Sequence, residues 1–125
     1  MEGAVREPCS DHKLTTTLVP SGHVHSWGKS LPDFLTYCPG KGTFGTDHGP
    51  INPSVEQNYV ILEKLFAEVA ARFPSNFVHL GGDEVPFGCW AHNQNLTDWM
   101  KEKGMKTYPQ LENYYEDRFV MMKAI

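Results

Sequence analysis

The feature that most constrains the fold is a long amphipathic helix pattern that returns, through a short turn, to a buried strand. Apolar residues recur at intervals of three and four from Val55 to Phe73, which is one face of a helix. Pro74 ends the pattern, and the mostly apolar run at residues 77–80 follows it. A helix that returns so quickly to a strand buried on both faces is half of a βαβ unit. The sequence therefore predicts an α/β fold.

The beginning of this helix has two candidate caps. Asn52 followed by Pro53 suits an N-cap with proline at the first helical position. Ser54 with Gln57 three residues later suits a capping box. The residues alone leave both starts open.

The rest of the chain has weaker patterns. Residues 1–22 have little periodicity, and 14–19 is the part best suited to a short strand. Residues 22–49, rich in Gly and Pro, and residues 85–93 are predicted to be loops. Long loops inside a compact domain are uncommon unless they serve a site.

Two helices are predicted near the C-terminus. A short one over residues 96–103 ends at Gly104 as its C′ residue. A second begins near Thr107, where Gln110 can complete a capping box. Its apolar face is expected at Leu111, Tyr115, Phe119 or Arg118, and Met122. A lone parallel strand among these helices would leave its backbone groups unpaired, so we expect the chain to be part of a larger α/β domain.

Composition narrows the function. In 125 residues, 40% are hydrophobic and 21% are charged, which is ordinary for a globular protein. The net charge of −4, without a basic stripe, argues against a nucleic-acid partner. No apolar run approaches the ~20 residues that span a bilayer, and the N-terminus lacks the apolar region of a signal peptide.

Two adjacent carboxylates follow the predicted strand. Asp83 and Glu84 come directly after Gly81-Gly82, at the carboxyl end where parallel α/β domains place active sites. Glycines allow the backbone to kink, so neighbouring side chains can serve one pocket. Two carboxylates in one pocket tend to share a proton, which suits glycoside cleavage. A helix-capping Asp83 beside a solvated Glu84 is the alternative.

Several motifs together resemble one family. Residues 79–85, His-Leu-Gly-Gly-Asp-Glu-Val, resemble the signature of family 20 glycoside hydrolases, the β-N-acetylhexosaminidases. Gly22-His23 with Ser26-Trp27-Gly28, residues 49–54, and Cys89-Trp90 match further family segments in order. Residues 18–21 depart from the family, so we expect a divergent, irregular segment at 1–21 and a partial catalytic domain at 22–125. The resemblance implies the middle strands and helices of a (β/α)8 TIM barrel, which needs ~250 residues when whole.

The resemblance also implies roles for named residues. Glu84 would be the general acid and base, and Asp83 would stabilise the substrate's own 2-acetamido group as the nucleophile. His23 would support the acid or contact the sugar. No cofactor is implied, and the ligands would be glycans that end in β-linked N-acetylhexosamine, GlcNAc or GalNAc. Because whole barrels are required, we expect this chain alone to be inactive.

Three cysteines and one sequon bear on location. The resemblance implies a disulfide between Cys38 and Cys89, with Cys9 unpaired, whereas the residues alone would favour free thiols. Asn95-Leu96-Thr97 is an acceptor for N-glycosylation, although Asn95 could instead cap the short helix. Family members are lysosomal or secreted and often dimeric, and we expect the same here.

Two other functions remain open on the sequence. A non-catalytic fragment could keep the motif and bind a sugar or a partner. His23 and His25 form an H-x-H pair typical of metal-dependent amidohydrolases, but no obvious set of further ligands accompanies it. We therefore expect no metal. Trp27 and Trp90 could line a sugar pocket or pack in a core.

Overall fold

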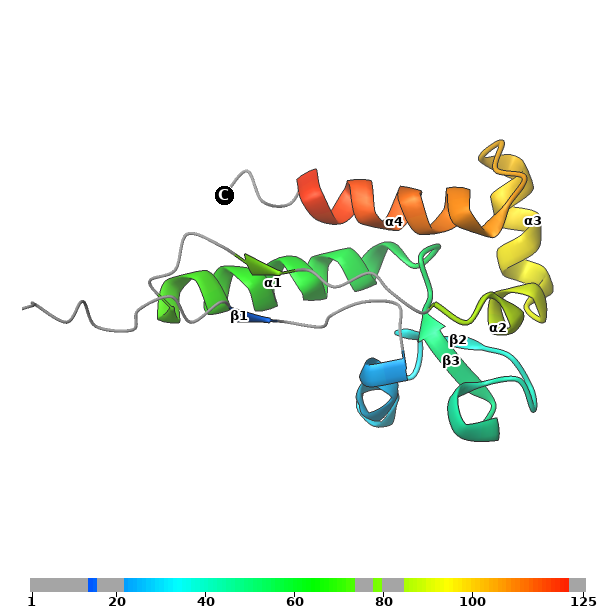
Figure 1. Cartoon of the computed structure of the whole chain (residues 1–125), viewed down its shortest axis with the longest axis horizontal. Helices are drawn as coiled ribbons and strands as arrows, with labels where there is room; N and C mark the ends of the chain where they lie inside the picture. Colours follow the sequence, from blue (N-terminus) through cyan, green and yellow to red (C-terminus); the bar gives the residue numbers. More distant parts are fainter. Residues whose placement is uncertain (1–13, 16–21, 74–77, 80–84, 122–125) are drawn as a thin grey trace, which may run out of the picture.

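A computed structural model describes residues 14–15, 22–73, 78–79 and 85–121 (Figure 1). Within these residues, two short sheets, two 3-10 helices and four α-helices follow one another. In order these elements are β1 (Leu14–Thr15), η1 (Gly22–Lys29), β2 (Leu35–Tyr37), η2 (Thr43–Gly45), β3 (His48–Ile51), α1 (Glu56–Arg72), β4 (Val78–His79), α2 (Phe87–Ala91), α3 (Gln94–Glu102) and α4 (Tyr108–Met121).

The sheets correct two predictions. β1 and β4 pair in parallel, with Leu14 opposite Val78, so β4 is not the unpaired strand that we expected. Residues 22–49 are not a long loop, because they form η1, η2 and an antiparallel hairpin of β2 and β3. The hairpin strands have only three and four residues, and their buried and exposed side chains do not alternate regularly. Contacts with distant segments, and not a local sequence pattern, therefore hold these residues as strands. Of the predicted strands at 14–19 and 77–80, the described parts are β1 and β4.

The predicted long helix is confirmed as α1, but neither predicted cap is used. Val55 is the N-cap, in extended conformation and without a side-chain hydrogen bond. The Asn52 Oδ1 atom accepts instead from the Ser54 backbone N–H at 3.0 Å and from its hydroxyl at 2.6 Å. This local turn, in which an asparagine side chain bonds its neighbours, competes with helix formation and delays the start of α1.

One apolar cluster joins α1 to α4, which lie side by side in Figure 1. The rings of Tyr59 and Tyr115 are 6.1 Å apart, and both residues are buried. The Arg118 guanidinium lies 4.0 Å from the centre of the Tyr59 ring and pairs with both carboxylate oxygens of Glu56. Arg118, one of the two predicted alternatives, thus faces α1. The hydrogen bond from Arg118 holds the pKa of Glu56 below its ordinary value.

A second apolar cluster lies under α2, α3 and the start of α4. Its buried members are Trp90, Leu96, Met100 and Leu111. The predicted short helix is α3, begun by Asn93, whose Oδ1 accepts from the Leu96 N–H at 2.8 Å. Asn95 is therefore not the cap. The predicted end of α3 at Gly104, which has a φ of +76°, is confirmed. The predicted start of α4 is confirmed too, because Thr107 and Gln110 form the capping box.

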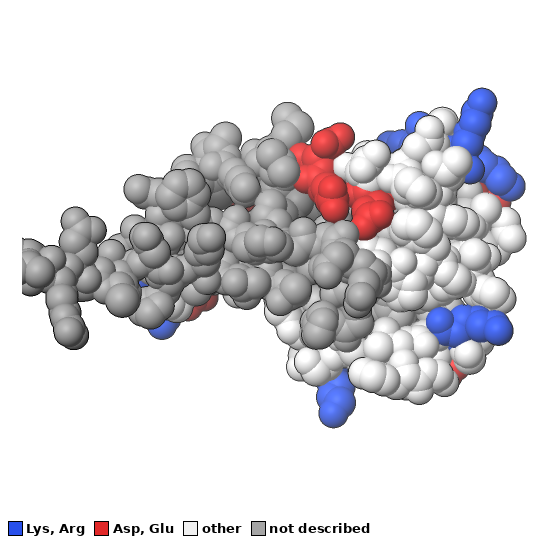
Figure 2. All heavy atoms as spheres, in the orientation of Figure 1, with Lys and Arg blue, Asp and Glu red and all other residues white. Residues whose placement is uncertain are grey.

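None of the described helices is long and apolar enough to cross a membrane. On the face drawn in Figure 2, acidic side chains gather over α4, whereas several Lys or Arg side chains lie near α3 at the upper right and the others lie singly towards the edges.

Candidate active site

The two predicted catalytic carboxylates, Asp83 and Glu84, lie outside the described residues. His23 belongs to η1, at its second position, and its side chain is not described. The structure describes the elements that precede and follow the two carboxylates in the sequence, and the element that contains His23. β4 precedes the carboxylates, Val85 and α2 follow them, and η1 carries His23. The contacts of these elements determine how the predicted site is held.

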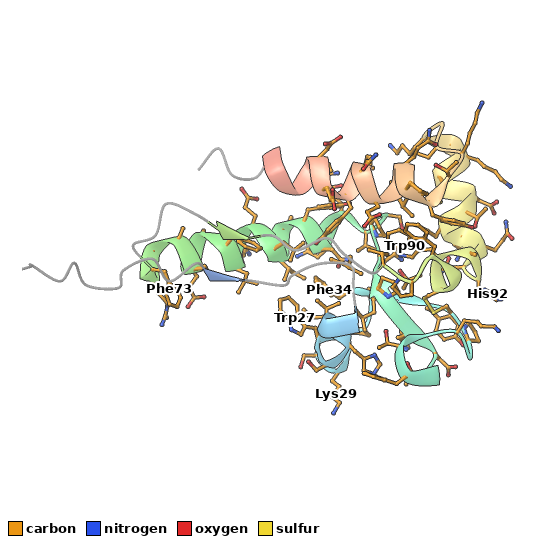
Figure 3. All side chains as sticks on the ribbon, in the orientation of Figure 1. Trp27, Lys29, Phe34, Phe73, Trp90 and His92 are labelled. Carbon is orange, nitrogen blue, oxygen red and sulfur yellow. A yellow bond between two sulfur atoms is a disulfide. The ribbon has the colours of Figure 1, made fainter. Side chains whose placement is uncertain are left out.

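The helix η1 packs closely onto the hairpin. Val24 is buried, and Trp27 lies against Phe34 with ring centres 5.2 Å apart (Figure 3). A Cβ atom on Gly28 would lie 2.6 Å from Leu35 Cδ1, so a side chain there would require the Leu35 side chain to shift. His23 is thus attached to a short helix with one well-packed face.

The segment after the carboxylates is a short helix, not the loop that we predicted for residues 85–93. In α2, the Phe87 ring stacks on Trp90 at 5.7 Å with an interplanar angle of 19°. Trp90 is fully buried, and its Nε1–H donates to the Ile51 carbonyl oxygen at 3.2 Å. A helix of five residues is unstable alone, so these long-range contacts keep it folded. Sequence periodicity gives little signal for such a helix.

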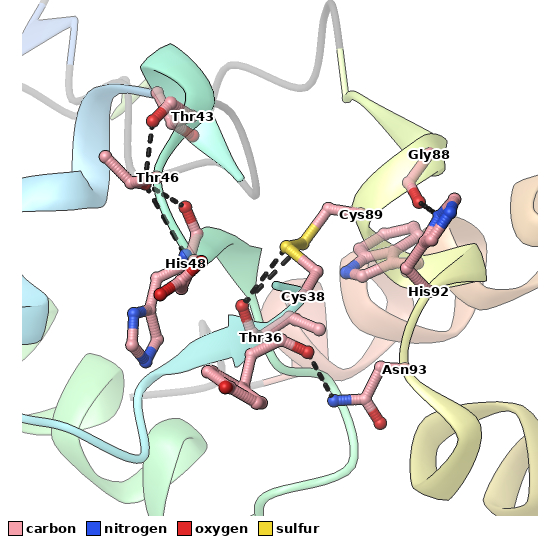
Figure 4. The surroundings of a disulfide bond; sticks show 12 residues. Thr36, Cys38, Thr43, Thr46, His48, Gly88, Cys89, His92 and Asn93 are labelled. Atoms are coloured by element: carbon pink, nitrogen blue, oxygen red, sulfur yellow. Dashed lines mark hydrogen bonds between the residues drawn. A yellow bond between two sulfur atoms is a disulfide. The ribbon is translucent and has the colours of Figure 1, made fainter. Parts of the chain in front are cut away.

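A disulfide joins the hairpin to α2, as the family resemblance implies. Cys38, which follows β2, is bonded to Cys89, with their Cα atoms 5.2 Å apart (Figure 4). Both residues are buried. The dashed lines in Figure 4 from the two sulfur atoms to the Thr36 carbonyl oxygen span 3.7 and 3.6 Å. Disulfide sulfurs carry no proton, so these are close contacts and not hydrogen bonds.

Gly49 makes room for this bond. It is buried in β3, and a Cβ atom there would lie 2.8 Å from Cys89 Cβ and 3.4 Å from Cys38 Sγ. Because real Cβ atoms do not approach so closely, a side chain at this position would push the disulfide away from the hairpin. No local sequence pattern indicates this role, although Gly49 opens a segment that resembles one of the family.

Buried polar side chains fix the hairpin to the rest of the molecule. The Thr36 hydroxyl donates to the Ile51 carbonyl oxygen at 3.2 Å. The Asn58 amide, from α1, donates to the carbonyl oxygens of Phe34 at 3.1 Å and Asn52 at 3.0 Å. Satisfied groups of this kind hold a backbone in one arrangement, because breaking them leaves buried polar atoms unpaired. The hairpin is therefore a fixed reference for η1 and α2.

The tryptophans serve the core in the described part of the chain. Trp90 is fully buried, and Trp27 is partly buried against the first cluster. Beside the hairpin is a cleft of about 450 Å³, whose lining includes Asp33, Tyr37 and His48. The sequence gives no local signal for this cleft, since its residues come together only when β2 and β3 pair.

Among the described residues, no three or more His, Cys, Asp or Glu side chains are grouped to hold a metal ion. His25, the second histidine of the H-x-H pair, has its ring 6.5 Å from the ring of Phe44, at the hairpin tip. Nothing in the described residues therefore supplies further ligands to that pair.

Comparison with known proteins identifies the family. The family model described as "Glycosyl hydrolase family 20, catalytic domain" matches residues 18–124. The chain belongs to glycosyl hydrolase family 20. Within it, the chain is 43% identical over 94 residues to the beta-hexosaminidase subunit alpha of Rattus norvegicus. It is 43% identical over 95 residues to the beta-hexosaminidase subunit beta of Homo sapiens. Each alignment covers 75% of this chain but only 18% and 17% of the relative.

A solved structure of the same family is also similar. It is a GH20 exo beta-N-acetylglucosaminidase from Vibrio harveyi in complex with N-acetylglucosamine, with a TM-score of 0.64 and 30% identity. The match covers 83% of this chain and 17% of the bacterial one. The chain thus spans about a sixth of the length of its family relatives, and its mixture of helices and strands is that of one part of a catalytic domain.

Proposed function

We propose that this chain is part of the catalytic domain of a β-N-acetylhexosaminidase, an enzyme that removes terminal β-linked GlcNAc or GalNAc from glycans. The observation that carries the proposal is the family match over residues 18–124, which includes His23, Asp83 and Glu84. The similar relatives are named beta-hexosaminidases, and the similar bacterial structure holds N-acetylglucosamine.

The proposed reaction is retaining and uses the substrate as its own nucleophile. The carbonyl oxygen of the 2-acetamido group attacks the anomeric carbon while the glycosidic bond breaks, and Glu84 gives its proton to the leaving oxygen. Asp83 accepts a hydrogen bond from the acetamido N–H and balances the positive charge of the oxazolinium intermediate. Water then attacks the anomeric carbon and breaks its bond to the acetamido oxygen, which regenerates the 2-acetamido group, while Glu84 takes one proton from the water and is restored as the acid. His23 positions the acid or contacts the sugar.

The disulfide supports this assignment from the structure. It connects the hairpin to α2, which begins at Phe87, shortly after the carboxylates in the sequence, while η1 with His23 packs on the same hairpin. Acid–base catalysis depends on holding such groups in place, because small displacements lower the rate strongly. A hairpin that anchors both flanking elements is suited to that purpose.

As a fold, we propose that residues 22–125 supply the middle strands and helices of a (β/α)8 barrel, after a divergent segment at residues 1–21. A whole barrel takes ~250 residues, and the chain has 125. A lysosomal or secreted location and a dimeric full-length protein follow from the same family assignment. The disulfide agrees with such a location, since these bonds persist in oxidising compartments.

The test compares two carboxylate variants in a barrel-length form of the protein. Glu84→Gln should slow cleavage of an alkyl glycoside by roughly 10²–10⁴-fold and slow an activated aryl glycoside much less, since that leaving group needs little protonation. Asp83→Asn should slow both alike, because it acts on the nucleophile. Glu63→Gln, which removes an exposed carboxylate on α1, is the matched control. Equal losses for both variants on every leaving group would refute the division of roles.

A second assay concerns the chain as it stands. We expect no turnover of a chromogenic β-N-acetylglucosaminide by the purified 125-residue chain, because much of a sugar pocket would have to come from other strands. Hydrolysis that resists a chelator would contradict the incomplete barrel, and hydrolysis that the chelator abolishes would favour a metal-dependent hydrolase. Binding of N-acetylglucosamine without turnover by a barrel-length form would favour a non-catalytic sugar-binding protein.

A further inference from the structure

The sequence contains a single acceptor for N-linked glycosylation. Asn95-Leu96-Thr97 has the required hydroxyl two residues after the asparagine. Asn52-Pro53-Ser54 has the same outline, but proline in the middle position excludes it. Any N-glycan on this chain is therefore expected at one place.

The structure separates Asn95 from the asparagine that builds the helix. Asn93 is fully engaged, because its Oδ1 caps α3 and its amide donates to the Tyr37 carbonyl oxygen at 2.9 Å. Asn95 is the second residue of α3, and its side chain is exposed. The next residue, Leu96, is buried against the second cluster, so Asn95 lies on a different part of the helix surface from the packed face. A bulky substituent on Asn95 would leave the packing intact.

A second observation points to the compartment where this modification occurs. The Cys38–Cys89 bond is buried, and Cys89 lies shortly before α3 in the sequence. Disulfides of this structural kind form in the secretory route, where glycans are also attached to Asn-X-Thr segments. α3 lies at the edge of the molecule in Figure 1, away from β1 and β4.

We propose that Asn95 carries an N-linked glycan and that the glycan is attached before α3 folds. A bond forms between Asn95 Nδ2 and the anomeric carbon of the first sugar of a lipid-linked oligosaccharide. The bond from that carbon to the lipid pyrophosphate breaks, the pyrophosphate leaves with the electron pair, and the amide loses one proton. This modification is independent of the proposed hydrolase activity.

The order of events follows from the acceptor's hydroxyl. In the folded chain the Thr97 hydroxyl donates to the Asn93 carbonyl oxygen at 3.2 Å, and Thr97 is half-buried. Leu96 is only 1% exposed. An enzyme that must grip this hydroxyl and the flanking backbone needs the segment unwound. The folded, oxidised chain therefore presents a poor acceptor, and the nascent chain presents a good one.

The first test is a gel-shift and mass measurement on the chain secreted from eukaryotic cells behind a cleavable leader. Treatment with a peptide N-glycosidase should lower the mass by one glycan and convert Asn95 to aspartate. Asn95→Gln and Thr97→Val should abolish this shift, while Thr97→Ser should retain it. The control Asn113→Gln, an exposed helical asparagine outside any acceptor, should leave it unchanged. An unshifted wild-type chain, or a shift that survives Asn95→Gln, would overturn the proposal.

The second test addresses the order. Purified oligosaccharyltransferase with a lipid-linked donor should modify the reduced, unfolded chain at least tenfold faster than the folded, oxidised chain. The Cys38→Ser and Cys89→Ser double variant, which lacks the bond that fixes α2 next to α3, should fall between them. Equal rates for the folded and unfolded chains would overturn the claim that attachment precedes folding.

Discussion

Replacing Gly49 by alanine should destabilise the chain through the disulfide. The new methyl group would lie 2.8 Å from Cys89 Cβ and 3.4 Å from Cys38 Sγ, and closer still to Cys89 Sγ. Overpacking of a buried site costs ~1–3 kcal/mol, while the lower entropy of an unfolded alanine returns ~0.4–1 kcal/mol. The φ angle of Gly49 is not in the left-handed region, so no backbone strain adds to this cost. We expect a net loss of about 1–2 kcal/mol.

The matched control is Gly88→Ala, one residue before Cys89. A Cβ atom there meets no described atom within 4 Å, and Gly88 lies inside α2. Alanine in a helix should stabilise the chain by ~0.5–1 kcal/mol relative to glycine. The two variants add the same methyl group beside the same disulfide, and they should move stability in opposite directions.

Urea unfolding under non-reducing conditions, followed by tryptophan fluorescence, measures both changes. With a slope of ~1–3 kcal/mol per molar urea, Gly49→Ala should lower the midpoint by roughly 0.5–1 M. Repeating the pair in a background of Cys38→Ala with Cys89→Ala, which itself should cost about 4 kcal/mol by loop entropy, isolates the sulfur contact. There the penalty at Gly49 should shrink by half or more. An unchanged penalty in that background, or equal midpoints for the two glycine variants, would refute the reasoning.

Three further expectations use the same unfolding assay. Leu111→Ala should cost ~2–5 kcal/mol because the side chain is fully buried, far more than the exposed Gln94→Ala. Asn93→Ala should cost ~1–2 kcal/mol through the lost helix cap and the bond to Tyr37, whereas Asn95→Ala should change little. The lowered pKa of Glu56 adds stability above the pKa of the unfolded carboxyl and loses it as pH falls through the folded value. Arg118→Met should remove this pH dependence of the free energy of unfolding. The change should be less than ~1 kcal/mol, since the Glu56 side chain is 73% exposed.

The sequence predicted those parts of the fold that local patterns determine. The α1 helix has five apolar repeats between Val55 and Phe73, and the end of α3 and the start of α4 use glycine and capping-box signals. Each depends on residues within a turn of one another, so each can be recognised without a partner. The predicted start of α1 was wrong because the Asn52 side chain accepts from the Ser54 backbone N–H and does not cap the helix.

Elements that are held by contacts with distant residues were not predicted from the sequence. The β2–β3 hairpin depends on Asn58 from α1 and on the disulfide to Cys89, and α2 depends on Trp90 reaching Ile51. Strands of three or four residues and a helix of five have too few positions to show a period. For the site, family motifs named Asp83, Glu84 and His23, whereas Gly49, which fits against the disulfide, emerged only from coordinates.

The anchoring of α2 has a consequence for how the proposed site could fail. α2 is too short to fold alone, so its position depends on one covalent bond and one buried tryptophan. The packing of α1 against α4 by Tyr59, Leu62 and Tyr115 uses neither contact, although Ile51, which accepts from Trp90, belongs to the same apolar cluster. Local opening of a protein follows its weakest set of contacts and need not unfold the rest. Loss of the disulfide should therefore loosen the segment that follows Glu84 before it unfolds α1. The rate of hydrolysis should then fall by a larger fraction than the helix content does.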